Sequence, residues 1–132
     1  MKIAISSSGK DLDSQIDPRF GRCQYFIFID PETMEFEALE NAGLMASGGA
    51  GVQAAQSVVQ KGASAVITGN LGPNAASALS ASGIKVYLVP EGTVKEVTEA
   101  YKSGTLKEVR GSTVPPHFGM GGGRGMGGRR DP

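Results

Sequence analysis

The chain has 132 residues, with one cysteine, no tryptophan, and 13 basic side chains against 13 acidic ones. This length suits one domain with a single core. One cysteine excludes an internal disulfide and a metal cage built only from cysteines, and no apolar run approaches the length of a membrane span. The start "MKIAISSSGK" is typical of a strand rather than a signal peptide, so we expect a cytoplasmic protein with no membrane partner.

The charge is unevenly distributed along the chain. Residues 1–118 carry ten basic and twelve acidic side chains, a balance of −2, and residues 119–132 carry three arginines and one aspartate, a balance of +2. The body therefore lacks the basic surplus of a nucleic-acid-binding protein, and we expect no nucleic-acid partner.

The first half of the chain predicts three strands. Residues 2–7 form a short β-type run, and residues 8–22 are polar and interrupted by glycine, as in a loop. The run 23–30, "CQYFIFID", is apolar enough for a strand covered on both faces, with Cys23 on the same side as Ile27. The turn signal "DPET" and the alternating segment 34–40 then predict a hairpin.

The second half alternates helices and strands. Val58 and Val59 are expected on the inner face of a first helix, which ends at Gly62. The remaining expected elements are a strand over 65–68, a helix from Pro73 to Gly83, a strand over 84–89, and a helix through Lys102 that opens with the capping box Thr93–Glu96.

This order predicts an α/β fold with a mixed sheet of about five strands and helices on both faces. The folded domain is expected to cover residues 1–111. Residues 112–132 are rich in Gly, Met and Arg and show no hydrophobic period, so we expect a disordered cationic tail there.

Three segments should meet at one edge of this sheet. Ligands of open α/β sheets bind beyond the carboxyl ends of the parallel strands. The loop after the first strand, the glycine-rich stretch 47–51 and the segment 68–74 belong there, and the last two each open a helix. Helix N-termini present N–H groups and a positive dipole end, so the crevice is expected to favour an anion.

Each of these motifs also has a simpler explanation. "GGAG" has neither the Lys-Ser/Thr of a phosphate-binding loop nor the spacing of a dinucleotide fingerprint, and could be a flexible lead-in. "TGNLGPN" could be a turn that starts a helix. Cys23 could be a small buried apolar residue, and His117 a solvated residue of the tail.

Taken together, "DPRFGRCQYFIFID" and "GGAGVQAAQSVVQKGASAVITGNLGPNAASALSASGIKVY" resemble the nitrogenase accessory factor family (NifX/NifB C-terminal-like), the dinitrogenase iron–molybdenum cofactor-binding domains. The resemblance implies a three-layer α/β/α fold of the ribonuclease H type. It implies a protein without catalysis of its own that binds or carries an iron–sulfur or iron–molybdenum type cluster, or its precursor, in metallocluster assembly or storage. Cluster-assembly or acceptor proteins are the partners implied, and we expect a monomer or a weak homo-oligomer.

The resemblance also implies which residues form the site. By position it points to Cys23 as a metal ligand and to the cofactor-binding residues Arg19, Phe20, Gly21, Arg22, Gly48, Gly49, Gly51, Gly69, Asn70, Gly72 and Asn74. Guanidinium groups and helix N-termini suit a sulfide-rich anion, and a thiolate could ligate iron. One cysteine fills a single coordination position, so tight binding would need His117, a second chain or exogenous sulfide.

Other functions stay open at this point. A phosphodiesterase of ribonuclease H architecture would need carboxylates on fixed strands, and the first strand has none. A regulatory domain that binds a small anion or a nucleotide would use the same glycine-rich helix starts. The tail could solubilise the protein, bind nucleic acid weakly through its arginines, or gather a cluster at the crevice with Met120 and Met126 as soft ligands.

Overall fold

The chain folds into one mixed sheet flanked by helices. The computed structural model describes residues 1–44 and 48–109; the expected boundary at 111, the tail and His117 lie outside the described residues. None of the helices in the described part is long and apolar enough to cross a membrane. The elements are β1 (Ile3–Ser7), β2 (Tyr25–Ile29), β3 (Phe36–Glu40), α1 (Ala50–Gln60), β4 (Ala65–Thr68), α2 (Pro73–Ala81), β5 (Lys85–Leu88), α3 (Val94–Ser103) and β6 (Glu108–Val109).

β1 lies inside the sheet, whose strand order is β3-β2-β1-β4-β5-β6, and its two pairings set the strand directions. It runs antiparallel to β2, with Ile5 opposite Ile27, and parallel to β4, with Ile5 opposite Ile67. β4 and β5 are also parallel, whereas β3 and β6 run antiparallel to their neighbours. The carboxyl ends of β1, β4 and β5 therefore lie at one end of the sheet.

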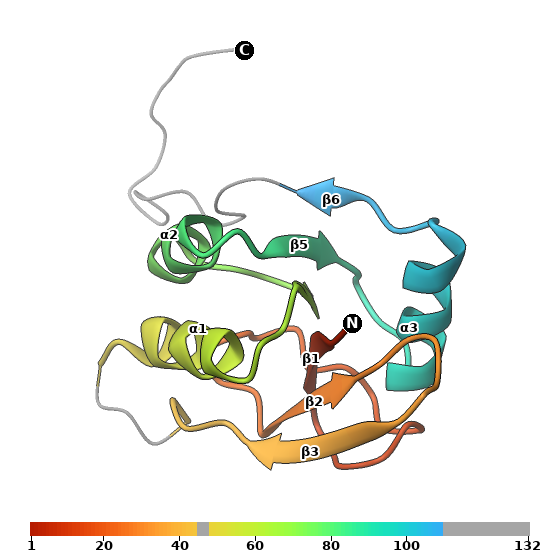
Figure 1. Ribbon diagram of the computed structural model, residues 1–132. Helices are drawn as coiled ribbons and strands as arrows, with labels where there is room; N and C mark the ends of the chain where they lie inside the picture. Colours follow the sequence, from red (N-terminus) through yellow and green to blue (C-terminus); the bar gives the residue numbers. More distant parts are fainter. Residues whose placement is uncertain (45–47, 110–132) are drawn as a thin grey trace.

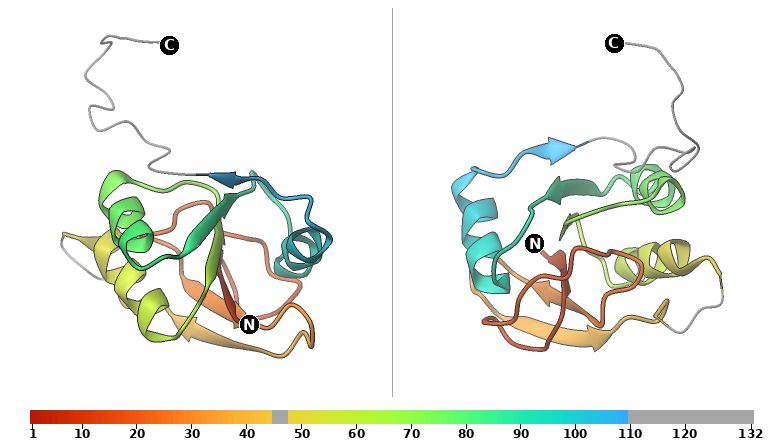
Figure 2. Two further views of the ribbon diagram at one scale, coloured as in Figure 1. Left: turned by 45° about the horizontal axis from the view of Figure 1, so that its top comes forward. Right: turned by 180° about the vertical axis from the view of Figure 1, so that it is seen from behind.

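Helices cover both faces of the sheet (Figure 1 and Figure 2). α1 and α2 lie side by side on one face, and α3 covers the other. Strand side chains alternate between the two layers, so that Phe26 and Val66 pack under α1 and α2, while Ile27 and Ile67 pack under α3. The expected three-layer α/β/α arrangement is confirmed, and its ribonuclease H label stays a prediction.

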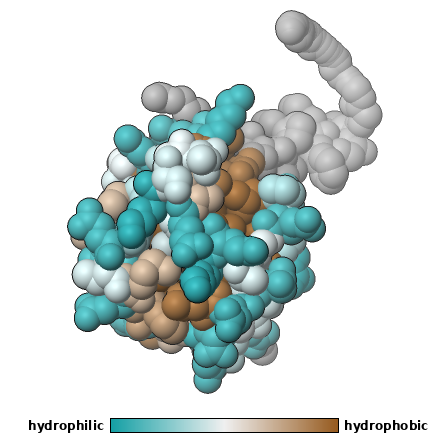
Figure 3. All heavy atoms as spheres, turned by 90° about the vertical axis from the view of Figure 1, so that its right-hand side faces the viewer, coloured by the Kyte–Doolittle hydropathy of each residue, from teal (hydrophilic) through white to brown (hydrophobic). Residues whose placement is uncertain are grey.

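α3 is an amphipathic helix with a complete N-terminal cap. Val94 and Val97 are buried against the sheet, and Tyr101 packs against the same cluster. The Thr93 hydroxyl accepts a hydrogen bond from the Glu96 amide at 3.1 Å, and the Glu96 carboxylate accepts one from the Thr93 amide at 2.9 Å. This confirms the expected capping box. Figure 3 shows this side of the molecule, where hydrophilic side chains surround smaller hydrophobic areas.

Three details differ from the expectations. Within the described residues the sheet has six strands rather than about five, because the two residues of β6 are too few to show a period in the sequence. β3 begins at Phe36 because Met34 takes a positive φ of 66° in the hairpin loop. Val59 is 38% exposed while Val58 is fully buried, since successive helical residues point about 100° apart.

Replacing Thr93 with alanine should remove the cap of α3. The hydroxyl that accepts the Glu96 amide is lost, so we expect the free energy of unfolding to fall by about 1 kcal/mol in urea denaturation. Thr93→Ser keeps the hydroxyl and should keep the stability. Equal losses in the two variants would show that the cap does not act through this hydrogen bond.

Candidate functional site

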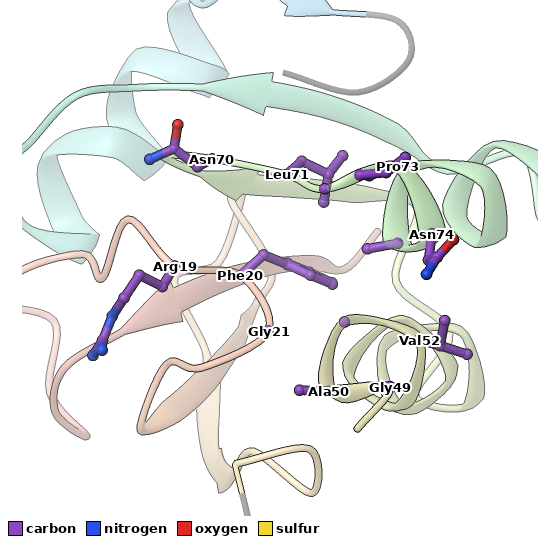
Figure 4. A pocket seen from close by; sticks show the side chains of 13 residues that line it. Arg19, Phe20, Gly21, Gly49, Ala50, Val52, Asn70, Leu71, Pro73 and Asn74 are labelled. Carbon is purple, nitrogen blue, oxygen red and sulfur yellow. The ribbon is translucent and has the colours of Figure 1, made fainter. Parts of the chain in front are cut away.

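A pocket lies beyond the carboxyl end of β4, where a loop and two helix starts meet (Figure 4). It encloses about 370 Å³. Its walls come from the loop after β1, the first turn of α1 and the segment that leads into α2. The lining residues are Arg19, Phe20, Gly21, Gly49, Ala50, Gly51, Val52, Asn70, Leu71, Gly72, Pro73, Asn74 and Ala75.

The ends of β1 and β4 are joined by buried hydroxyl groups. Ser6 Oγ lies 2.6 Å from the carbonyl oxygen of Asp17 and 2.7 Å from Thr68 Oγ1. Ser6 and Thr68 are fully buried, so these hydrogen bonds offset the cost of removing both hydroxyls from water. The hydrogen bond to Asp17 also fixes the position of the loop after β1 at the point where it turns towards the pocket.

Beyond the strands, the two loops touch at a glycine. The Asn70 amide donates to the carbonyl oxygen of Pro18 at 2.7 Å. Gly69 passes so close to Pro18 that an added Cβ would stand 2.6 Å from the Pro18 Cα. This contact holds the following residues of the loop, Arg19 to Gly21, against the pocket.

Glycines also let the two helix starts approach the loop. A Cβ placed on Gly51 would stand 3.3 Å from the Ala75 Cβ, and one placed on Gly21 would stand 3.0 Å from the Gly51 nitrogen. The loop, α1 and α2 therefore converge around Gly51 with backbone rather than side chains between them.

The two helix starts at the pocket differ from that of α3. Their N-cap residues are Gly49, with a φ of 70°, and Gly72; within the described residues neither helix has a side-chain cap or an acidic residue in its first turn. First-turn amides have no acceptor within their own helix, and these line the pocket. The positive ends of two helix dipoles therefore face the same space.

Arg19 lies on the pocket wall, but its guanidinium forms an ion pair with the Asp17 carboxylate. Its Nε and Nη2 each donate to the Asp17 carboxylate at 3.1 Å, and its backbone amide donates to Oδ1 at 2.9 Å. The hydrogen bonds that the Asp17 carboxylate accepts, and then its charge, raise the pKa of Arg19 above the ordinary value. In Figure 4 the guanidinium points away from Phe20 and the helix starts. The helix ends thus supply the positive potential that is directed into the pocket.

Cys23 lies beneath the pocket rather than on its wall. It is fully buried, and its Sγ donates to the carbonyl oxygen of Phe20 at 3.5 Å. Burial, and then the charge of Asp17, raise the pKa of the Cys23 thiol to about 12. The thiol is therefore protonated at neutral pH, a form that does not ligate metals well.

The expected side of Cys23 in the sheet is wrong. Cys23 packs in the cluster of Phe26, under α1 and α2, whereas Ile27 packs under α3. The chain bends at Gln24 and β2 begins only at Tyr25, so the alternation of the strand does not extend back to the cysteine.

The structure brings together most of the residues expected to bind a cofactor. Those that line the pocket are Arg19, Phe20, Gly21, Gly49, Gly51, Asn70, Gly72 and Asn74. Gly48 precedes the pocket wall, Gly69 packs on Pro18, and Arg22 Nη1 donates to the carbonyl oxygen of Leu44 at 3.1 Å, so these three do not line it. Binding by any of these residues stays a prediction.

Metal ligation is not organised within the described part of the chain. No three or more His, Cys, Asp or Glu side chains gather there in a way that could hold a metal ion. Cys23 does not reach the pocket, and His117 lies outside the described residues.

Two residues that sequence analysis did not single out shape the site. Pro18 supports Gly69, and the side chain of Asn41 holds the loop through the carbonyl oxygens of Gly21 and Cys23. Pro18 lies within the run "DPRFGRC", and Asn41 follows a predicted strand. A proline in a loop and an asparagine after a strand are ordinary turn residues, so the sequence pattern does not indicate either role.

Comparison with known proteins identifies the family. The sequence pattern of the family described as "Dinitrogenase iron-molybdenum cofactor" matches residues 1–104. The chain belongs to this family. The apo form of the orange protein from Desulfovibrio gigas is 39% identical to it with a TM-score of 0.81, over 85% of this chain and 95% of that one.

Two further relatives agree with the family assignment. A NifB-like protein from Thermotoga is 42% identical with a TM-score of 0.71, over 81% of this chain and 91% of that one. An uncharacterized protein of Methanocaldococcus jannaschii is 30% identical over 111 residues, which is 82% of this chain and 91% of the relative. The resemblance found in the sequence is confirmed.

Substitution of Gly69 tests the contact between the two loops. In Gly69→Ala the added methyl group would overlap Pro18, so we expect the free energy of unfolding to fall by about 1–3 kcal/mol in urea denaturation. Gly48→Ala is the matched control, because nothing lies within 4 Å of its added Cβ and Gly48 is not an N-cap residue, where alanine would itself be unfavourable. A Gly69→Ala protein as stable as the control would contradict the close packing.

Cys23 should make stability depend on alkaline pH. Its pKa is raised in the folded state, so the stabilisation is complete below the ordinary thiol value of about 8.5 and is lost as pH rises towards 12. Between pH 8 and 10 the protein should lose about 1–2 kcal/mol more of its unfolding free energy than Cys23→Ala does. Parallel pH profiles of the two proteins would show that the thiol ionises as easily in the folded chain.

Proposed function

We propose that the pocket binds an anionic metal–sulfur cluster of the iron–sulfur or iron–molybdenum type, or its precursor, and that the protein carries this cargo without converting it. One observation carries the proposal: two helix starts without side-chain caps among the described residues open onto one pocket, in a member of the dinitrogenase iron–molybdenum cofactor family. Such helix ends favour anions through their N–H groups and dipoles.

The chemistry of the lining supports holding an anion by its outer atoms. The wall offers first-turn amides, the carboxamides of Asn70 and Asn74, and the Arg19 guanidinium at its edge. All of these donate hydrogen bonds, which suits the sulfide surface of a cluster. The Cys23 thiol lies below this wall with its proton directed to Phe20. In this proposal the metal ions keep the sulfide ligands that they bring with them.

A carrier exchanges its cargo with other proteins. Proteins that assemble the cluster and proteins that accept it are therefore the partners that this role requires. The pocket is open at the rim where Arg19 is 66% exposed, so cargo can enter and leave without unfolding of the loop.

Substitution of Asn74 tests the proposal without disturbing the fold. Asn74 is an exposed residue of the first turn of α2 that lines the pocket. In Asn74→Asp a negative charge favours the helix end by roughly 0.3–1 kcal/mol but repels an anion in the pocket. We expect unchanged or slightly higher stability and about tenfold weaker binding of tetrathiomolybdate, the simplest anion of molybdenum and sulfide.

The binding experiment is anaerobic. Each protein is mixed with tetrathiomolybdate alone, or with ferrous iron and sulfide, then desalted, and its visible absorption and metal content are measured. Gln56→Glu adds the same charge at an exposed position of α1 that does not line the pocket, and should bind as the parent does. Parent protein that retains no chromophore under either condition would overturn the proposal, and amide shifts caused by nucleotides alone would favour a small-anion regulator.

A further inference from the structure

Asn41 is a buried polar residue that the pocket does not use directly. It follows β3 immediately, and only 4% of its surface is exposed. It is not among the residues that line the pocket. Burying a carboxamide is costly unless its hydrogen-bonding groups are satisfied, so its contacts indicate what holds it there.

The Asn41 side chain joins two separate segments. Its Nδ2 donates to the carbonyl oxygens of Gly21, at 3.1 Å, and Cys23, at 3.0 Å, which uses both amide hydrogens. Its Oδ1 accepts a hydrogen bond from the Gly43 amide at 2.9 Å. The carboxamide therefore fastens the loop that walls the pocket to the turn that follows β3.

Both segments press on the first turn of α1. A Cβ placed on Gly43 would stand 2.5 Å from the Ala50 carbonyl oxygen, and one placed on Gly21 would stand 3.0 Å from the Gly51 nitrogen. Ala50 and Gly51 are the first two residues of α1, and both line the pocket. The Asn41 side chain thus holds in place the two backbone segments that contact the first turn of α1.

We propose that Asn41 is a positioning residue, which seats the first turn of α1 against the loop of Gly21 and so sets the affinity of the pocket for its anionic cargo without touching it. Only the effect on affinity for the anionic cargo rests on the proposed function. The seating of α1 is a property of the empty protein and can be measured without any ligand.

Asn41→Ser separates the two connections. A serine hydroxyl can still accept the Gly43 amide, as serine does in such turns, but it cannot reach both carbonyl oxygens of the loop. The first closed turn of α1 has the Gln53 amide donating to Gly49 at 3.0 Å, and α2 has the equivalent bond from Ala76 to Gly72 at 3.0 Å. We expect hydrogen exchange of the Gln53 amide to accelerate about tenfold relative to that of Ala76, and tetrathiomolybdate to bind about tenfold more weakly.

Thr98→Val is the control for a purely structural loss. Thr98 is fully buried in α3, on the other face of the sheet, and donates to the Val94 carbonyl oxygen at 2.7 Å. Its replacement removes a buried hydrogen bond, but it should leave both the ratio of the two exchange rates and the affinity unchanged. If Asn41→Ser does not fold, Gly43→Ala presses on Ala50 from the same side with Asn41 intact, and should change the same two readouts.

The outcomes separate this inference from the proposed function. Equal acceleration at Gln53 and Ala76, with unchanged affinity, would overturn the positioning role and leave Asn41 as a residue of general stability. Selective acceleration at Gln53, in a protein whose parent binds no tetrathiomolybdate, would support the seating of α1 while the proposed function fails. Selective acceleration together with weaker binding supports both.

Discussion

The parallel pairing of β1 with β4 is the constraint on which the pocket depends. Because both strands end at the same edge, the segments that leave them start side by side. The contact of Ser6 with Thr68 joins the strand ends inside the protein, and the hydrogen bond from Asn70 to Pro18 joins the loops beyond them. A register shift of one residue would turn the side chains of the shifted strand to the opposite face and separate these partners. The register of the sheet thus determines the distance between the pocket walls.

The electrostatics of the pocket come from the backbone more than from side chains. Arg19 makes three hydrogen bonds to Asp17, whose carboxylate is only 8% exposed, so the two charges largely compensate each other. An exposed ion pair contributes little to stability, but a buried carboxylate left without its partner is costly. The ion pair therefore stabilises the conformation of the loop, and the dipoles of α1 and α2 provide the positive potential in the pocket. This explains how a body with a net negative balance of charged side chains can present a site suited to anions.

The sequence predicts which segments converge on the pocket because the signals for them are local. Glycine runs and Pro73 mark helix starts, and the rule for parallel strands places those starts at one edge. The supporting residues escaped because their signals are not local: Asn41 and Pro18 act through contacts with segments far away in the sequence. The side of Cys23 was misjudged because strand alternation has meaning only from the first paired residue onward, and the bend at Gln24 comes before it.

The position of Cys23 shows why a matching motif does not settle a ligand. To ligate iron the thiol would have to lose its proton, yet burial and the nearby Asp17 favour the protonated form. The same proton is directed to the carbonyl oxygen of Phe20, a residue of the pocket wall, so ionisation would remove a hydrogen bond that the wall depends on. Packing and metal ligation are therefore competing uses of this residue. The geometry favours packing, with Cys23 and Asn41 holding the loop from below while backbone amides face the pocket.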